Sequence, residues 1–253
     1  MYKNLRHGLP LCLLLLGLAS GLPGQITQWP TTVAPGRFLL EMNALSLTLD
    51  HEPGYKYTAF GAASTLLSTG LTDHLDLQLG ADLFVSQRIE RGSFTERRSG
   101  VGAMRVRTKW RFFDEDGTAV AIMPYVRIPT NRDTTGTKSL EGGVIVPWST
   151  NLPSGFKFAA MGELDFQRND NDNGYDTHWY ASATFSRPIT QALGIYGEAT
   201  LGKSTGSGSA EGIMGGGVTF AVSQDLWWDY AIYKGISQVA ADWKHVLRLN
   251  VRF

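Results

Sequence analysis

The chain has 253 residues, of which 43% are apolar, and its 23 basic and 23 acidic side chains give a formal net charge of zero. This length allows one large domain or two small ones, and the apolar content excludes a disordered chain. Because there is no basic excess, nucleic acid is not expected as a partner. With 29 glycines and few blocks of strong helix formers, the composition favours strands.

Residues 1–21 have the three-part layout of a secretory signal peptide. Lys3 and Arg6 precede the apolar block LPLCLLLLGLA, and Ala19-Ser20-Gly21 supplies small residues for cleavage, which we expect between positions 21 and 24. The apolar block is too short to span a bilayer comfortably, so a retained anchor is not expected. Cys12 lies inside that block instead of after a small residue, which argues against a lipoprotein.

Cleavage leaves a mature chain without cysteine, because Cys12 is the only one. Such a chain has no disulfide, no thiolate nucleophile and no cysteine metal ligand. We expect neither a cofactor nor a metal, and no enzymatic activity. Residues 22–36, which include QITQWPTTV, are expected to form an N-terminal periplasmic segment. Whether this stretch closes the periplasmic mouth of the protein is left open by the sequence.

Alternation of apolar and polar residues recurs along the rest of the chain. In LDLQLGADLFVS (75–86), Leu, Ala and Val, ending with Val85, occupy one face, and Asp, Gln and Ser, ending with Ser86, occupy the other. VGAMRVRTKWRFF (101–113) and KHVLRLNVRF (244–253) alternate in the same way. A period of two predicts strands with one apolar and one polar face.

The same pattern predicts about twelve strands, many of them long enough to cross a bilayer at a tilt. They lie near residues 37–50, 56–68, 75–87, 100–113, 118–129, 140–148, 156–168, 177–186, 193–203, 211–222, 226–235 and 243–253. Compact turns such as DEDG and SQD alternate with longer polar connections such as QRIERGSFTERRS (87–99) and TNRDTTGTKS (130–139). Short turns at one end and longer loops at the other are typical of outer-membrane barrels, with both termini at the periplasmic, short-turn end.

Aromatic residues near the predicted strand ends distinguish a membrane barrel from a soluble sandwich, because they form girdles at the two interfaces. They are Trp110, Phe112, Trp148, Trp179, Trp228, Trp243 and Phe253. The sequence therefore predicts an all-β fold: a transmembrane antiparallel up-and-down β-barrel of about 12 strands over residues 37–253, in the bacterial outer membrane. The expected partners are outer-membrane lipid and lipopolysaccharide, the barrel-assembly machinery through the C-terminal Phe253, and a small-molecule solute, with the barrel as a monomer.

Several stretches resemble a bacterial outer-membrane family described as "putative MetA-pathway of phenol degradation", which is transporter-like. The similar stretches are APGRFLLEMN (34–43), STGLTDHLDLQLG (68–80), KWRFFDEDGTAVAIMPYVRIPT (109–130) and the C-terminal Arg252-Phe253. STGLTDHLDL and the RFFDEDG hairpin are the most specific of them. The resemblance implies a barrel of about twelve strands and uptake of hydrophobic or aromatic compounds, and it brings no catalytic residues.

Charged residues on the polar faces are expected to line the lumen. They are Asp76, Asp82, Arg105, Arg107, Lys109, Arg111, Lys157, Glu163, Asp165, Glu198, Asp229 and Arg248. Two interpretations stay open: the charges neutralise one another across strands, or they form a constriction that filters solutes by size and charge. The first predicts a plugged surface or structural barrel, and the second predicts a passive small-molecule channel.

Three motifs point to other functions. GEATLGKS (197–204) matches a phosphate-binding loop, but a glycine- and serine-rich stretch follows it where a helix is required. NDNDNG (169–174) resembles the start of a calcium loop, whose twelfth position would be Tyr180 instead of Glu. A lipid hydrolase would need His178 beside a serine, and Ser182 on the same strand face is the candidate.

Overall fold

The computed structural model describes residues 26–130, 135, 139–169, 173–206 and 209–253. The expected signal peptide lies outside these ranges, as do residues 170–172 of the NDNDNG stretch. Within the described residues no helix has the length and apolar character needed to span a membrane.

Thirteen strands and one short 3₁₀ turn, η1 (Pro153–Gly155), make up the described chain. The strands are β1 (Phe38–Glu52), β2 (Tyr55–Thr72), β3 (Leu75–Arg91), β4 (Phe94–Gly100), β5 (Met104–Glu115), β6 (Thr118–Ile128), β7 (Glu141–Asn151), β8 (Lys157–Arg168), β9 (Tyr175–Pro188), β10 (Leu193–Ser204), β11 (Ala210–Ala221), β12 (Leu226–Gly235) and β13 (Trp243–Arg252).

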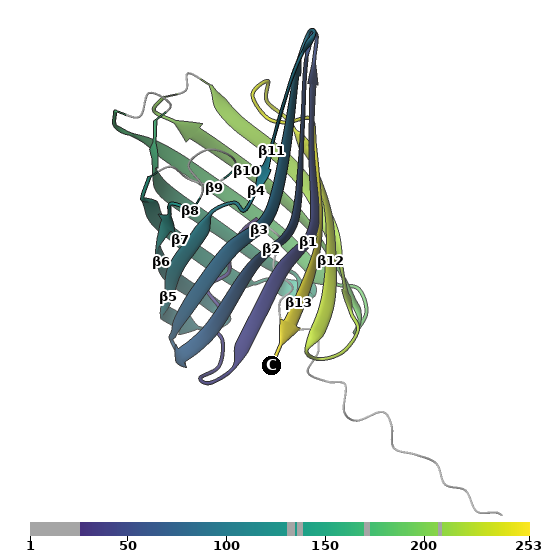
Figure 1. The fold of residues 1–253 in the computed structure, drawn as a ribbon. Coiled ribbons are helices and arrows are strands. Elements are labelled where there is room, and N and C mark those ends of the chain that lie inside the picture. Colours follow the sequence, from purple (N-terminus) through teal and green to yellow (C-terminus); the bar gives the residue numbers. More distant parts are fainter. Residues whose placement is uncertain (1–25, 131–134, 136–138, 170–172, 207–208) are drawn as a thin grey trace, which may run out of the picture.

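Twelve of these strands close into an antiparallel barrel, as the sequence predicts. The order runs β2-β1-β13-β12 and onward through β5 to β3, and the pairing of β2 with β3 closes the ring. The thirteenth strand, β4, pairs only with the far half of β3. The C-terminus lies at the end where the connections are short, and the longer connections gather at the opposite end (Figure 1).

The barrel is polar inside and apolar outside. On β3, Asp76 and Gln78 face the interior and are 0% and 2% exposed, whereas Leu79 on the outer face is 50% exposed. Aromatic rings collect on the outer surface near the short-turn end, where Trp110 contacts Phe112 and Phe158 contacts Phe185. Such a girdle is what a membrane interface requires.

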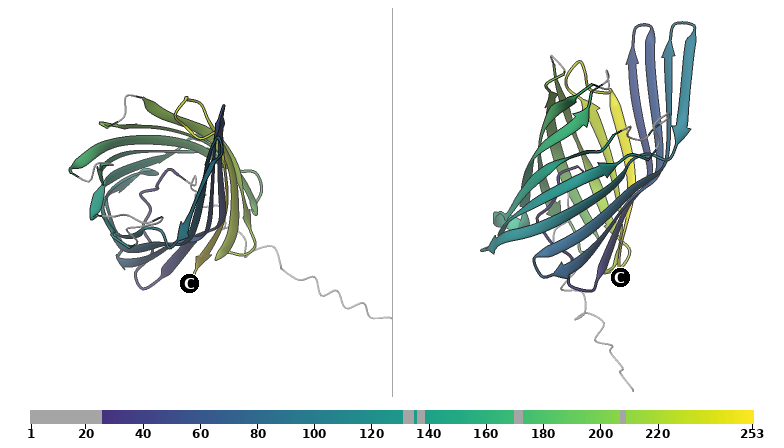
Figure 2. Two further views of the ribbon diagram at one scale, coloured as in Figure 1. Left: turned by 45° about the horizontal axis from the view of Figure 1, so that its top comes forward. Right: turned by 60° about the vertical axis from the view of Figure 1, so that its left-hand side comes forward.

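The expectation of a loop at residues 87–99 is wrong, because this segment forms the end of β3 and nearly all of β4. The far halves of β1, β2 and β3, together with all of β4, continue beyond the barrel wall as a protruding sheet (Figure 2). This part of the sheet rises past the barrel wall, so its strands enclose no lumen and carry no regular period-two signal. The pattern therefore reads as a polar loop although the backbone pairs regularly from Val85↔Gly100 to Arg91↔Phe94.

The long strands β1, β2 and β3 each have an irregularity at the same level, just below the protruding sheet. Beyond it, the residues that would have pointed inward point outward. The register of β1 against β13 shifts between Asn43 and Leu45, and in β2 Ala63 has a positive φ of 54°. On β3, Asp82 faces the interior while Phe84, two residues further, lies on the outer face. Val85 therefore shares the inner face, and the predicted apolar face of 75–86 ends at Leu83.

Candidate functional site in the barrel interior

Residues 26–34, here called the inner segment, run through the barrel interior (Figure 2). At one end Glu198 on β10 accepts hydrogen bonds from the backbone N–H groups of Ile26 (3.2 Å) and Thr27 (2.6 Å). At the other end Asp76 on β3 accepts one from the N–H of Val33 (3.0 Å). Since β3 and β10 lie six strand steps apart in either direction around the twelve-stranded ring, the inner segment crosses the lumen from wall to wall.

Further contacts hold the middle of the inner segment. The hydroxyls of Thr27 and Ser182 lie 2.9 Å apart, and the guanidinium of Arg107 donates to the side-chain oxygen of Gln28 at 3.1 Å. The ammonium of Lys109 donates to the carbonyl of Thr31 at 2.8 Å. Two of the predicted lumen cations therefore bind the chain itself.

A close backbone approach fixes the place where the inner segment joins the wall. The N–H of Gly36 donates to the carbonyl of Gly70 at 3.2 Å, and Pro35 forms an isolated bridge with the same residue. A Cβ on Gly70 would lie 2.2 Å from the carbonyl oxygen of Val33. Only glycine at position 70 of β2 leaves room for this approach.

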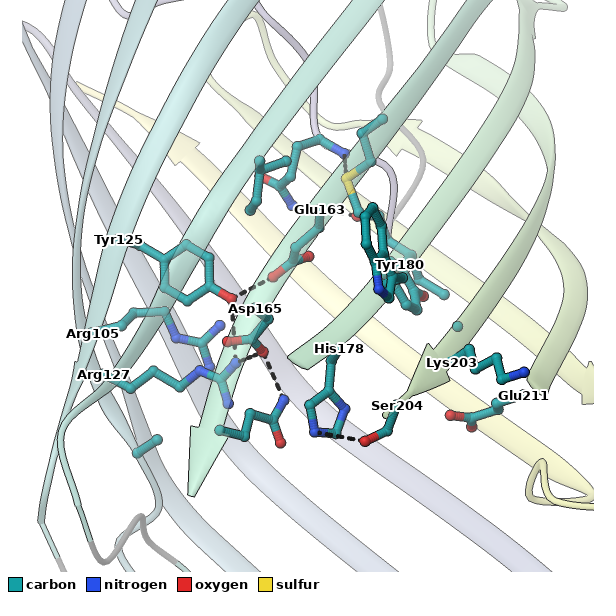
Figure 3. A pocket seen from close by; sticks show the side chains of 18 of the residues that line it. Arg105, Tyr125, Arg127, Glu163, Asp165, His178, Tyr180, Lys203, Ser204 and Glu211 are labelled. Atoms are coloured by element: carbon teal, nitrogen blue, oxygen red, sulfur yellow. Dashed lines mark hydrogen bonds and ion pairs between the residues drawn. The ribbon is translucent and has the colours of Figure 1, made fainter. Parts of the chain in front are cut away.

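On the side of the longer connections the interior opens into a cavity of about 760 Å³, here called the outer cavity. Its floor includes Ile26 and Gln28 of the inner segment, and Figure 3 shows Arg105, Tyr125 and Arg127 pointing into it from one wall. The lining also includes Ile145, Met161, Tyr180 and Glu211. The cavity therefore combines aromatic and aliphatic surface with both signs of charge.

The charges of the outer cavity are largely paired with one another. Arg127 forms ion pairs with Asp165 and, at 3.2 Å, with Glu141. The hydroxyl of Tyr125 donates to Glu163 at 2.5 Å, and Arg105 lies 3.5 Å from Asp82. The wall thus combines paired charges with aromatic rings, and Arg107, Lys203 and Glu211 add further charge to its lining.

On the short-turn side a second cavity of about 590 Å³, the inner cavity, lies below residues 27–34. Its walls carry Asp76, Lys109, Arg111, Lys157 and Arg248. Arg248 approaches Glu41 at 3.7 Å and donates to Asn43 at 2.9 Å. The inner segment thus separates two polar compartments along one barrel axis.

The structure places all twelve predicted lumen residues in the barrel interior. Five line the outer cavity, five line the inner cavity and two are buried against tyrosines. Asp82, Arg105, Arg107, Glu163 and Asp165 line the outer cavity, and Asp76, Lys109, Arg111, Lys157 and Arg248 line the inner one. Glu198 and Asp229 are buried, where they accept hydrogen bonds from Tyr233 (2.7 Å) and Tyr196 (2.9 Å). Their role in solute passage stays a prediction.

Sequence reasoning missed the tyrosines and the glycines that make room for them. Tyr196, Tyr233, Ala231 and Val246 form a cluster inside the barrel, against which Ile26 packs. A Cβ on Gly217 would lie 2.5 Å from the hydroxyl of Tyr196. The GGG run at 215–217 of β11 was a usable signal, since such a run on a strand marks close approach of bulky neighbours.

The other motifs do not assemble into sites among the described residues. GEATLGKS lies in β10 and the next element is the strand β11, so no helix follows it, as predicted. His178 does not meet Ser182: its ring lies 3.3 Å from the hydroxyl of Ser204, while Ser182 contacts Thr27. In the described ranges no three His, Cys, Asp or Glu side chains are grouped to hold a metal, and residues 170–172 of the calcium candidate lie outside them.

The model of the family "Putative MetA-pathway of phenol degradation" matches residues 24–253. The chain belongs to this family. The resemblance noted in the sequence is therefore confirmed. A comparison with curated proteins gave no match.

Solved structures show the same architecture at low sequence identity. An outer membrane channel from Pseudomonas putida F1 matches with a TM-score of 0.65 and 14% identity, over 92% of this chain and 100% of that one. The translocator domain of the autotransporter NalP from Neisseria meningitidis matches with 0.53 and 9%, over 87% and 89%. The chain thus has the fold of an outer-membrane β-barrel.

Proposed function

We propose that the protein is a monomeric channel for passive uptake of small molecules across the outer membrane, with the inner segment as its constriction. The observation that carries this is the arrangement of two polar cavities on one axis, separated by a single extended stretch of chain. Open cavities lie on both sides of that stretch, so it narrows the lumen without filling it. A solute passes beside it or with it displaced.

The outer cavity supports aromatic or hydrophobic compounds as solutes. Tyr125, Tyr180, Ile145 and Met161 offer rings and aliphatic surface, while Arg105 lies at the rim with its side chain 40% exposed. A ring that carries one polar or anionic substituent can stack on the tyrosines and approach that guanidinium. The family description, which names phenol degradation, points to the same chemical class.

Uptake into proteoliposomes tests this proposal. Benzenesulfonate is an aromatic anion that a lipid bilayer excludes, and isethionate is a sulfonate without a ring. We expect protein-containing vesicles to take up benzenesulfonate, and faster than isethionate, relative to protein-free vesicles. Uptake no faster than in protein-free vesicles would contradict a channel, and equal rates for both anions would contradict the preference for rings.

A plugged structural barrel is the alternative that the ion pairs around Arg127 favour, and it predicts no uptake of either anion. We propose no catalytic step, because among the described contacts the ring of His178 is hydrogen-bonded to the hydroxyl of Ser204 and to no carboxylate. We further propose that the C-terminal Phe253, which stacks on Phe38 at 5.5 Å, is the feature that the barrel-assembly machinery engages.

A further inference from the structure

The outward face of the protruding sheet carries cations directly above an apolar belt. Leu45 of β1 pairs with Leu247, whose neighbour Arg248 points into the interior, so Leu45 faces outward. Ala62 of β2 and Phe84 of β3 lie in register with Leu45 and share this face. Residues in register across neighbouring strands form a row, and every second row belongs to this outward face.

Successive rows change from apolar to basic within a few residues. One row consists of Leu47, Phe60, Ser86 and Ser99, and Phe60 contacts Phe84 of the row beneath at a ring distance of 6.3 Å. The next row, about 7 Å further from the barrel, consists of Leu49, Thr58, Arg88 and Arg97. The row above it contains His51, Lys56, Glu90 and Thr95. Aromatic residues below cations are the pattern of a headgroup level.

Like charges face each other in the basic row. Arg88 lies directly opposite Arg97, an arrangement that destabilises a strand pair unless an anion lies between the two. Glu90 neutralises Arg88 at 2.8 Å. Over the described part of the chain, Arg97 and Lys56 form no ion pair, and both are exposed.

The inward face of the same sheet is different. There Arg98 forms an ion pair with Glu96 at 2.5 Å, and Arg91 lies over the ring of Tyr55 at 5.7 Å. Arginines on that face are thus satisfied within the protein. The surplus of positive charge is confined to the outward face.

We propose that Arg88, Arg97 and Lys56 bind the phosphate groups of lipopolysaccharide in the outer leaflet. A guanidinium matches phosphate with two parallel hydrogen bonds, and a phosphate between Arg88 and Arg97 removes their repulsion. The acyl chains of the same lipid then lie along the belt formed by Leu45, Phe60 and Phe84. The site anchors the protruding sheet at the membrane surface and does not depend on which solute the lumen passes.

The test uses the full chain, purified in detergent, and lipid A with two phosphates as the probe, with binding followed by native mass spectrometry. We expect the double variant Lys56→Gln/Arg97→Gln to bind lipid A about tenfold more weakly. Arg98→Gln, which removes an exposed arginine from the inward face of the same strand, is the matched control and should change binding by less than about twofold. Heat-modifiability on gels checks that each barrel is folded.

A second comparison leaves the protein unchanged. Lipid A without phosphates should bind the natural chain as weakly as intact lipid A binds the double variant. Undiminished binding of the phosphate-free probe would overturn the proposal, and so would equal loss in Arg98→Gln and in the double variant. Tighter binding of phosphatidylglycerol than of lipid A, lost in the same variant, would instead assign the site to an ordinary anionic phospholipid and overturn the assignment to lipopolysaccharide.

Discussion

At the scale of single residues, two carboxylates on opposite walls decide where the inner segment lies. Glu198 and Asp76 each accept backbone N–H bonds from it, and such bonds to a charged acceptor contribute about 2 kcal/mol each in a buried setting. Neither contact is visible in the sequence, because a backbone donor leaves no residue signature. The charges themselves could be predicted, since they alternate with lipid-facing residues.

Glu198→Gln should release the first end of the inner segment. The amide keeps the size of the side chain but loses the negative charge that both N–H groups bind, so we expect the released fraction to rise about tenfold or more. The reporter is Thr27→Cys, a buried position whose labelling by a water-soluble maleimide requires release. Glu211→Gln, which removes a cavity charge without contact to the inner segment, should leave the labelling rate unchanged.

Gly70→Ala should displace the other end. Its Cβ would lie 2.2 Å from the carbonyl of Val33, a distance that neither backbone can tolerate, so the inner segment must move away from β2. We expect faster maleimide labelling at the Thr27→Cys reporter and a folded barrel. Gly162→Ala is the control, because nothing lies within 4 Å of the added Cβ. Equal labelling in both variants would show that the approach at Gly70 does not hold the inner segment.

At the scale of elements, the strands with one lipid-facing side could be predicted from the sequence. The strand segments without a lipid-facing side could not be predicted. Alternation located β5, β8 and β13, because each has lipid on one side and water on the other. It failed for β4, which pairs only with β3 beyond the barrel wall and encloses no part of the lumen. It also failed beyond Leu83 of β3, where the reversal of faces ends the regular alternation.

The packing of Tyr196 against β11 requires a glycine at position 217. Gly217→Ala would place a Cβ 2.5 Å from the hydroxyl of Tyr196 and should cost about 1–3 kcal/mol of barrel stability through the displaced tyrosine. Gly197→Ala on β10, whose added Cβ would lie 4.0 Å from the carbonyl oxygen of Gly215, should cost less than about 1 kcal/mol. Urea unfolding in lipid vesicles measures the difference, and equal stabilities would contradict tight packing around Tyr196.

At the scale of the whole molecule, the barrel has a polar interior that the inner segment divides into two cavities. The fold follows from the sequence, since a closed ring of twelve strands is how alternating segments satisfy every backbone group in lipid. The division of the lumen does not follow, because QITQWPTTV has no period and only its contacts show its place. Both interpretations of the lumen charges stay predictions: Arg127 is paired with Asp165, as mutual neutralisation expects, and Lys109 binds the inner segment, where the proposed constriction lies.

Single-channel conductance in planar bilayers tests this account most directly, with the natural chain compared with a variant that lacks residues 26–34. If the inner segment is the constriction of a passive channel, the natural chain gives small conductance steps and the shortened chain gives steps at least about twofold larger. Equal steps in both would contradict a constriction at the inner segment. Silent bilayers from both would contradict a channel altogether and would favour a barrel plugged by its own charges.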